Sequence, residues 1–99
     1  MLHIINKSPF ERNSLESCLR VAQKGSTLLF IEDGVYAALE GSRVAETLRQ
    51  AMQEHTLCVL EPDLKARGIA SKAMDGINRV DYTGFVDLVA ESERVQSWL

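Results

Sequence analysis

The sequence has little of what most enzymes use for chemistry. It contains two cysteines and two histidines among 99 residues. Neither Cys18 nor Cys58 belongs to a Cys-x-x-Cys pair or to a cysteine–histidine spacing typical of zinc sites. No G-x-G-x-x-G or Walker sequence occurs, which argues against a bound nucleotide. We therefore expect neither a metal nor a cofactor.

Positive charge and long apolar runs are also scarce. Lysine and arginine total 11 against 14 aspartates and glutamates, so the formal net charge is −3. Direct binding to nucleic acid depends on a basic surface that displaces counterions, and we expect no such partner. No apolar run approaches the roughly 20 residues that span a bilayer, and residues 1–5 lack the basic start of a signal peptide. These features predict a cytoplasmic protein without a membrane partner, whose cysteines stay thiols.

The apolar pattern predicts strands that alternate with helices. The expected strands are Leu2–Asn6, Thr27–Ile31, Thr56–Leu60 and Ile77–Val80. The expected helices are a main one from Ser14 to Gly25, then Val35–Leu39, Arg43–Gln53, Leu64–Arg67 and Tyr82–Glu93. Such alternation indicates a parallel sheet with helices on both faces. We predict one α/β domain over residues 1–99, with three α/β/α layers and a mainly parallel sheet of four to five strands.

Acidic residues follow three of the expected strands. Ligands of parallel sheets bind at the carboxyl ends of the strands, where Asp33, Asp63 and Asp81 are expected. A carboxylate there can act as a general base. Aspartates that cap the following helix are much commoner, however, and we interpret all three as caps or turn residues.

Cys18 supports the sharpest functional hypothesis. We expect it in the first turns of the first helix, where the positive end of the helix dipole and nearby Arg12 lower the pKa of a thiol. A thiolate of this kind can attack a persulfide and carry its terminal sulfur onward. The alternative is an inert core thiol, because Cys18 shares an apolar stripe with Leu15 and Leu19. Both interpretations stay open, whereas Cys58 is interpreted as a packing residue.

Two further side chains have structural interpretations. His3 lies within the first strand and is interpreted as a packed or hydrogen-bonded residue, not a base. Trp98 in the apolar C-terminal tail either covers the core of the domain or anchors a partner, since tryptophan is enriched at interface hot spots.

Several stretches, taken in their order and spacing, resemble the DsrH/TusB family over practically the whole chain. These stretches are Met1-Leu2-His3, Lys7-Ser8-Pro9, Glu32-Asp33-Gly34-Val35 with Ala37-Ala38, Asp63-Leu64-Lys65-Ala66-Arg67-Gly68, Asp81-Tyr82, Phe85-Val86-Asp87-Leu88 and Trp98. The resemblance implies a DsrE-like fold and a heterohexamer that holds two copies each of three homologous subunits. The implied partners are DsrE/TusD-like and DsrF/TusC-like subunits, with a DsrC/TusE-like protein as sulfur acceptor. Such assemblies pass persulfide sulfur between proteins, so we expect a sulfur carrier or transfer subunit and not a stand-alone enzyme.

The resemblance also bears on the pathway. The segment Asn13–Leu19 with its Cys18 is similar to the DsrH pattern, because enterobacterial TusB-like proteins lack a cysteine in this helix. We therefore expect a DsrEFH-like complex for intracellular sulfur oxidation, with Cys18 as candidate persulfide carrier. The alternative is a TusB-like structural subunit, without a sulfur-carrying cysteine of its own, for 2-thiolation of the wobble uridine of tRNA. In either complex the principal sulfur-carrying cysteine is implied to lie on the DsrE/TusD-type subunit.

Overall fold

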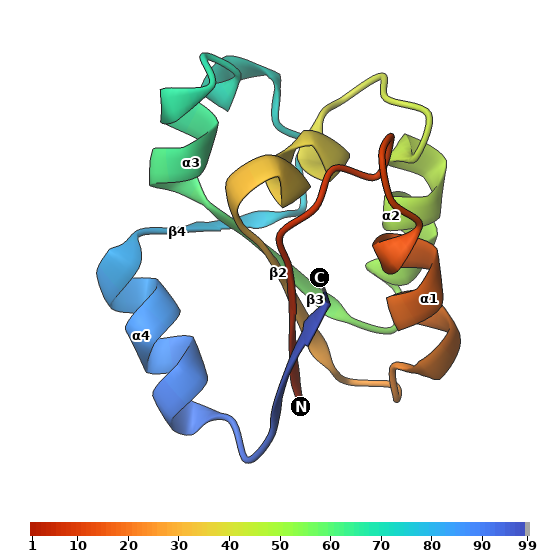
Figure 1. Cartoon of the computed structure of the whole chain (residues 1–99), viewed down its shortest axis with the longest axis vertical. Coiled ribbons are helices and arrows are strands. Elements are labelled where there is room, and N and C mark those ends of the chain that lie inside the picture. Colours follow the sequence, from red (N-terminus) through yellow and green to blue (C-terminus); the bar gives the residue numbers. More distant parts are fainter. Residues whose placement is uncertain (99) are drawn as a thin grey trace.

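A computed structural model describes residues 1–98 and confirms the predicted α/β architecture (Figure 1). Five strands form one sheet in the order β4-β3-β2-β1-β5, and every pairing is parallel. The strands are β1 (Leu2–Ile5), β2 (Thr27–Phe30), β3 (Thr56–Leu60), β4 (Asn78–Val80) and β5 (Val95–Trp98). The sequence did not locate β5, which lies in the C-terminal tail; Leu99, the residue after this strand, lies outside the described residues.

Three of the five expected helices are shorter than the sequence predicts, the one expected at Leu64–Arg67 is longer, and the one expected at Val35–Leu39 is a 3-10 segment. The observed helices are α1 (Ser14–Val21), α2 (Ala45–Ala51), α3 (Glu61–Ala66) and α4 (Tyr82–Glu91), with 3-10 segments η1 (Glu32–Ala38) and η2 (Ala70–Lys72). The first helix ends four residues before Gly25, because Ala22 already adopts an extended backbone (ψ 128°). Gly25 instead takes φ +89° in the turn that leads into β2, a conformation that favours glycine.

The two faces of the sheet are buried to different depths. Alternate strand residues point to opposite faces, and the helices α1 and α2 lie on one face while α4 lies on the other (Figure 1). The main cluster, on the α1/α2 face, contains sixteen buried residues, among them Phe30 and Leu48. The minor cluster, on the α4 face, consists of the four buried residues Leu2, Ile4, Leu29 and Cys58.

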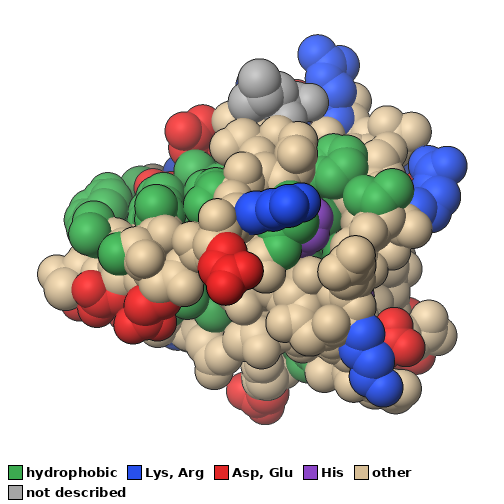
Figure 2. Space-filling view, turned by 90° about the horizontal axis from the view of Figure 1, so that it is seen from below, with side chains coloured by type: hydrophobic (Ala, Val, Ile, Leu, Met, Phe, Trp, Pro, Cys, Tyr) green, Lys and Arg blue, Asp and Glu red, His purple; other side chains and the backbone are tan. Residues whose placement is uncertain are grey.

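Helix α4 covers the minor cluster with only part of its apolar surface. None of its residues is fully buried; Phe85 and Leu88 pack on the minor cluster and are themselves partly buried. Tyr82 and Val86 are 62% and 64% exposed. Figure 2 shows the resulting group of hydrophobic side chains on this side of the molecule, bordered by acidic ones. No helix within residues 1–98 has both the length and the apolarity needed to cross a membrane.

Candidate functional site

Cys18 lies in the middle of α1 and faces the main cluster. It is the fifth residue of an eight-residue helix, and its exposed fraction is 0%. Leu15, one turn earlier on the same stripe, is buried beside it in the same cluster, and Leu19 packs against that cluster. The apolar stripe that the sequence indicated is therefore confirmed, and it carries the thiol into the core.

The expected depression of the Cys18 pKa is wrong. Burial raises the pKa of the Cys18 thiol from 9.0 to about 11, because the charged thiolate loses its hydration among apolar side chains. Arg12, which was expected to oppose this, is exposed to solvent. Desolvation therefore outweighs the helix dipole at a position in the second turn of α1.

Cys58 occupies the opposite face of the sheet. It lies in β3, is 3% exposed, and belongs to the minor cluster. Burial raises the pKa of its thiol, and a hydrogen bond with the side chain of Asn78 opposes that shift in part. Both cysteines are free thiols, as predicted, and the sheet separates them.

The carboxyl ends of β2 and β3 are joined by an arginine. The Arg67 side chain donates two hydrogen bonds to Asp33 Oδ1, from Nε at 3.0 Å and from Nη2 at 2.9 Å. A third bond runs from Arg67 Nη1 to the backbone carbonyl of Asp63 at 3.2 Å. The Asp63 carboxylate in turn accepts a bond from the backbone N–H of Glu32 at 2.6 Å. We call these four residues the carboxyl-edge clamp; they connect two stretches that carry the family resemblance.

The structure does not confirm Asp33 and Asp63 as helix caps. Asp33 forms an ion pair with Arg67, and Asp63 holds the loop after β2; neither side chain caps its own helix. Helix α3 instead begins with a proline in its first turn, which suits a position where a backbone donor has no helical partner. Asp81 does cap α4, accepting a bond from the backbone N–H of Gly84 at 2.8 Å, so that prediction is confirmed.

Backbone geometry at this edge is tightly constrained. Glu32 adopts φ +50°, an uncommon conformation for a residue with a side chain. A Cβ atom on Gly34 would lie 2.1 Å from the carbonyl oxygen of Ile5, which is closer than any real contact. Glycine at position 34 therefore allows the loop after β2 to cross the end of β1.

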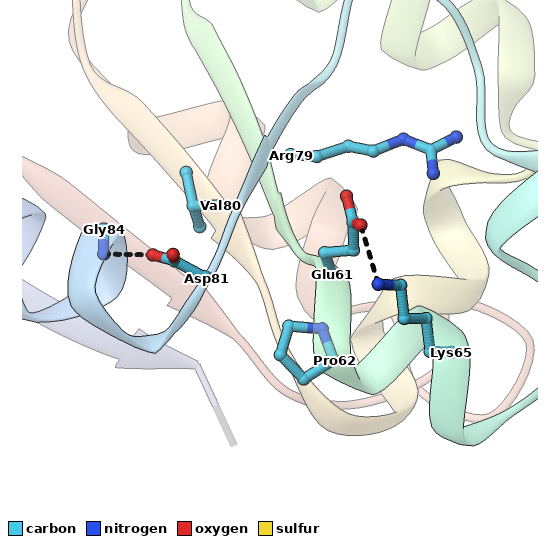
Figure 3. Close-up of a pocket in the computed structure, with 7 residues that line it drawn as sticks. All are labelled: Glu61, Pro62, Lys65, Arg79, Val80, Asp81 and Gly84. Atoms are coloured by element: carbon cyan, nitrogen blue, oxygen red, sulfur yellow. Dashed lines mark hydrogen bonds and ion pairs between the residues drawn. The ribbon is translucent and has the colours of Figure 1, made fainter.

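An open groove of about 430 Å³ lies beside the clamp, at the ends of β3 and β4 (Figure 3). Its polar side chains include Glu61 and Lys65, which form an ion pair at 3.2 Å, and Arg79, which donates to the carbonyl of Ala70 at 2.6 Å. Asp81, on the far side, is engaged in capping α4. Glu61 and Lys65 are therefore paired with each other, and Arg79 and Asp81 each bond a backbone group. In the part of the chain that the structure describes, no three metal-binding side chains gather.

The first and last strands meet through a pair of side chains that the sequence did not connect. Trp98 Nε1 donates a hydrogen bond to His3 Nδ1 at 3.0 Å, which places the proton of a neutral His3 on Nε2. Trp98 also packs against the main cluster, so it covers the domain's own core, one of its two interpretations. His3 is 2% exposed, and burial lowers its pKa. Both observations agree with the prediction that His3 is a packed residue and not a catalytic base. Only the parallel pairing of β1 with β5 reveals this contact between residues 95 positions apart.

Solved structures with this fold are distant in sequence. The ychN protein from E. coli superimposes with a TM-score of 0.81 at 18% identity, covering 97% of each chain. The protein MTH1491 from Methanobacterium thermoautotrophicum gives a TM-score of 0.74 at 14% identity, covering 97% of this chain and 96% of that one. At these identities the likeness establishes the fold, which agrees with the predicted DsrE-like architecture.

Other proteins share a much higher sequence identity with this chain. Protein TusB from Klebsiella pneumoniae (strain 342) is 40% identical over 98 residues, which is 99% of this chain and all of that protein. Protein TusB from Shigella flexneri is 36% identical over the same share of both chains. The family model described as "DsrH like protein" matches residues 7–95. This chain therefore belongs to the DsrH-like family, to which the resemblance in its sequence assigned it.

Proposed function

We propose that this chain is a TusB-type subunit of a sulfur-relay assembly that supplies sulfur for 2-thiolation of the wobble uridine of tRNA. Its contribution is structural: it completes the assembly and does not carry sulfur itself. The observation that supports this most is the 40% identity to a TusB protein over practically the whole of both chains. The complete burial of Cys18 agrees with it.

Sulfur transfer requires an acceptor thiol that can ionise and be reached, so the burial of Cys18 bears directly on its role. An acceptor thiolate attacks the terminal sulfur of a donor persulfide; a new S–S bond forms, the donor S–S bond breaks, and the donor leaves as a thiolate. No net oxidation occurs, but the acceptor must be both ionised and reachable. With a pKa of about 11, about one Cys18 thiol in ten thousand is ionised at neutral pH. Cys18 also has no exposed surface for a donor protein to approach.

The partners follow from the family. The assembly is a heterohexamer with DsrE/TusD-like and DsrF/TusC-like subunits, in two copies of each of the three, and it passes sulfur to a DsrC/TusE-like acceptor. The principal sulfur-carrying cysteine belongs to the DsrE/TusD-like subunit. Because tRNA is modified in the cytoplasm, the assembly works there. The acidic net charge of −3 suits a subunit that contacts proteins and not the tRNA itself.

This proposal replaces the sulfur-oxidation interpretation as the better supported of the two. That interpretation depended on the presence of a cysteine in the first helix. The named relatives at 36–40% identity are TusB proteins, and they favour the alternative. A role of Cys18 as persulfide carrier remains a prediction, and both its burial and its raised pKa weigh against it.

Nucleoside mass spectrometry of tRNA tests the proposal. Cells of the source organism that lack this chain should lose most of their wobble 2-thiouridine, and the wild-type gene should restore it. The Cys18→Ala variant should restore it equally well, since alanine removes only the sulfur atom and adds no polar group. Unchanged 2-thiouridine in the deletion strain would overturn the pathway. A folded Cys18→Ala variant that fails to restore it would overturn the structural role.

A further inference from the structure

The exposed side of α4 forms a shallow apolar groove. Five residues line it, with a volume of about 450 Å³: Tyr82, Phe85, Val86, Val89 and Ala90. Their spacing of three and four residues places them along one side of the helix. Val86, at the centre, is 64% exposed, and Tyr82 at the helix start is 62% exposed. Helix α4 already covers the minor cluster with Phe85 and Leu88. A further patch of exposed apolar side chains on such a helix is typical of a protein contact surface.

The charged residues of α4 and its immediate ends are acidic, while Arg79 and Arg94 lie just beyond them. Residues 81–93 contain four carboxylates and no lysine or arginine. Asp87 and Glu91 lie one turn apart on the helix and are both exposed, next to the apolar side. Figure 2 shows acidic side chains along the edge of the hydrophobic group. The surface therefore combines an apolar centre with an acidic border.

This border discriminates between the possible occupants. A second copy of the chain would bring another Asp87 and Glu91 toward these carboxylates, and like charges at an interface are costly. An anionic lipid surface would be repelled in the same way, because surface-bound helices attach through basic residues. A partner protein whose apolar contact surface is bordered by lysine or arginine would match both the groove and its charge.

We infer that the apolar, acid-bordered face of α4 is the docking surface for a homologous subunit of different sequence, whose contact surface is apolar with a basic border. The inference rests on the proposed function, because it assigns one contact of that assembly to one helix. The inference assigns the contact with the neighbouring subunit to α4 and not to the opposite face of the sheet, where α1 and α2 lie.

Co-expression with the DsrE/TusD-like and DsrF/TusC-like subunits of the same organism tests it, with native mass spectrometry of the purified assembly. Val86→Asp places a charge at the centre of the groove and should weaken association about tenfold or more. Val21→Asp on α1 is the matched control, because Val21 is 63% exposed and lies outside the groove. That control should assemble like the wild type. Circular dichroism of each purified variant verifies folding.

Exchanging the border charges tests the predicted partner chemistry. Asp87→Lys combined with Glu91→Lys should weaken association about tenfold while leaving the apolar centre intact. Wild-type association should weaken as salt is raised, and that of the charge-exchanged variant should not.

The outcomes separate this inference from the proposed function. If the wild-type chain joins no homologous subunit, both fail. If it assembles and folded Val86→Asp assembles equally well, only the docking surface fails. A dimer of the chain alone that Val86→Asp dissolves would instead identify a second copy as the occupant. Wild-type sedimentation with phosphatidylserine vesicles, lost in Val86→Asp, would identify a lipid surface; either result overturns the inference.

Discussion

The two faces of the sheet differ in how completely the chain buries them. On the α1/α2 face, sixteen residues form the main cluster, and helices and 3-10 segments close over it. On the α4 face, four buried residues lie under one helix that keeps much of its own apolar surface exposed. Most of the buried apolar area therefore lies on the first face, and the proposed docking surface lies on the second. Each face holds one of the two cysteines, and three pairs of substitutions below compare residues at the two sides.

Two phenylalanines should show the largest difference. Phe30 on β2 is 0% exposed in the main cluster, whereas Phe85 on α4 is half-buried. Phe30→Ala should lower the free energy of unfolding by about 3–5 kcal/mol, because it leaves a cavity that the packed surroundings cannot fill. Phe85→Ala should cost about 1–2 kcal/mol, since less area leaves water there on folding. Urea unfolding measures both, and equal losses would contradict the contrast between the faces.

Two glycines give the next largest difference. Gly34→Ala should destabilise the chain by about 3 kcal/mol, at the upper end for an overpacked site. The added Cβ would meet the backbone oxygen of Ile5 at 2.1 Å, and backbone gives way less readily than a side chain.

Gly84→Ala on α4 brings its Cβ to 3.0 Å from the side chain of Val80. Alanine gains about 1 kcal/mol of helix propensity there, so the net change should stay below about 1 kcal/mol. Thermal denaturation distinguishes the two; a neutral Gly34→Ala would disprove the close crossing of β1 and η1.

The cysteines sharpen the comparison further. Cys18→Ser should cost about 2 kcal/mol, because it buries a hydroxyl among apolar side chains. Cys58→Ser should cost less than about 1 kcal/mol, since Asn78 already bonds the side chain at that position. Chemical denaturation of both variants measures this. A greater loss at Cys58 would mean that Asn78 is not a usable partner.

A smaller effect depends on pH. Burial, with smaller contributions from the N-terminal amine and His55, lowers the pKa of His3 from 6.5. The unfolded chain then binds the proton more tightly than the folded one. The free energy that neutral His3 contributes to folding is therefore fully present above about pH 6.5. It is lost as the pH falls from there toward the lower pKa that His3 has in the folded chain.

Fluorescence can follow this titration, because Trp98 is the single tryptophan and donates to His3. The urea midpoint should fall between about pH 7 and pH 5, and His3→Gln, which keeps an acceptor but does not titrate, should flatten that fall. An unchanged slope in His3→Gln would assign the pH dependence to other groups.

Much of this fold could be predicted from local sequence pattern. The apolar runs in β2 and β3 and the stripe through Leu15 and Cys18 identified elements that the structure confirms. β5 could not be located, because Val95–Trp98 is an edge strand with three exposed residues and lacks a continuous apolar run. The clamp was missed for a related reason: Asp33 and Arg67 are 34 residues apart, and only the sheet brings them together. The error at Cys18 came from judging a thiol by its distance from the helix start, when its side of the helix decides its solvation.

The location of labile sulfur in the working assembly tests the central claim most directly. The wild-type assembly and one with Cys18→Ala in this chain are incubated with a persulfide donor, and intact mass spectrometry weighs each subunit. We expect the added sulfur atom on the DsrE/TusD-like subunit in both assemblies, at equal rates, and never on this chain. Added sulfur on Cys18, with transfer lost in the alanine variant while the assembly keeps its mass, would contradict the account.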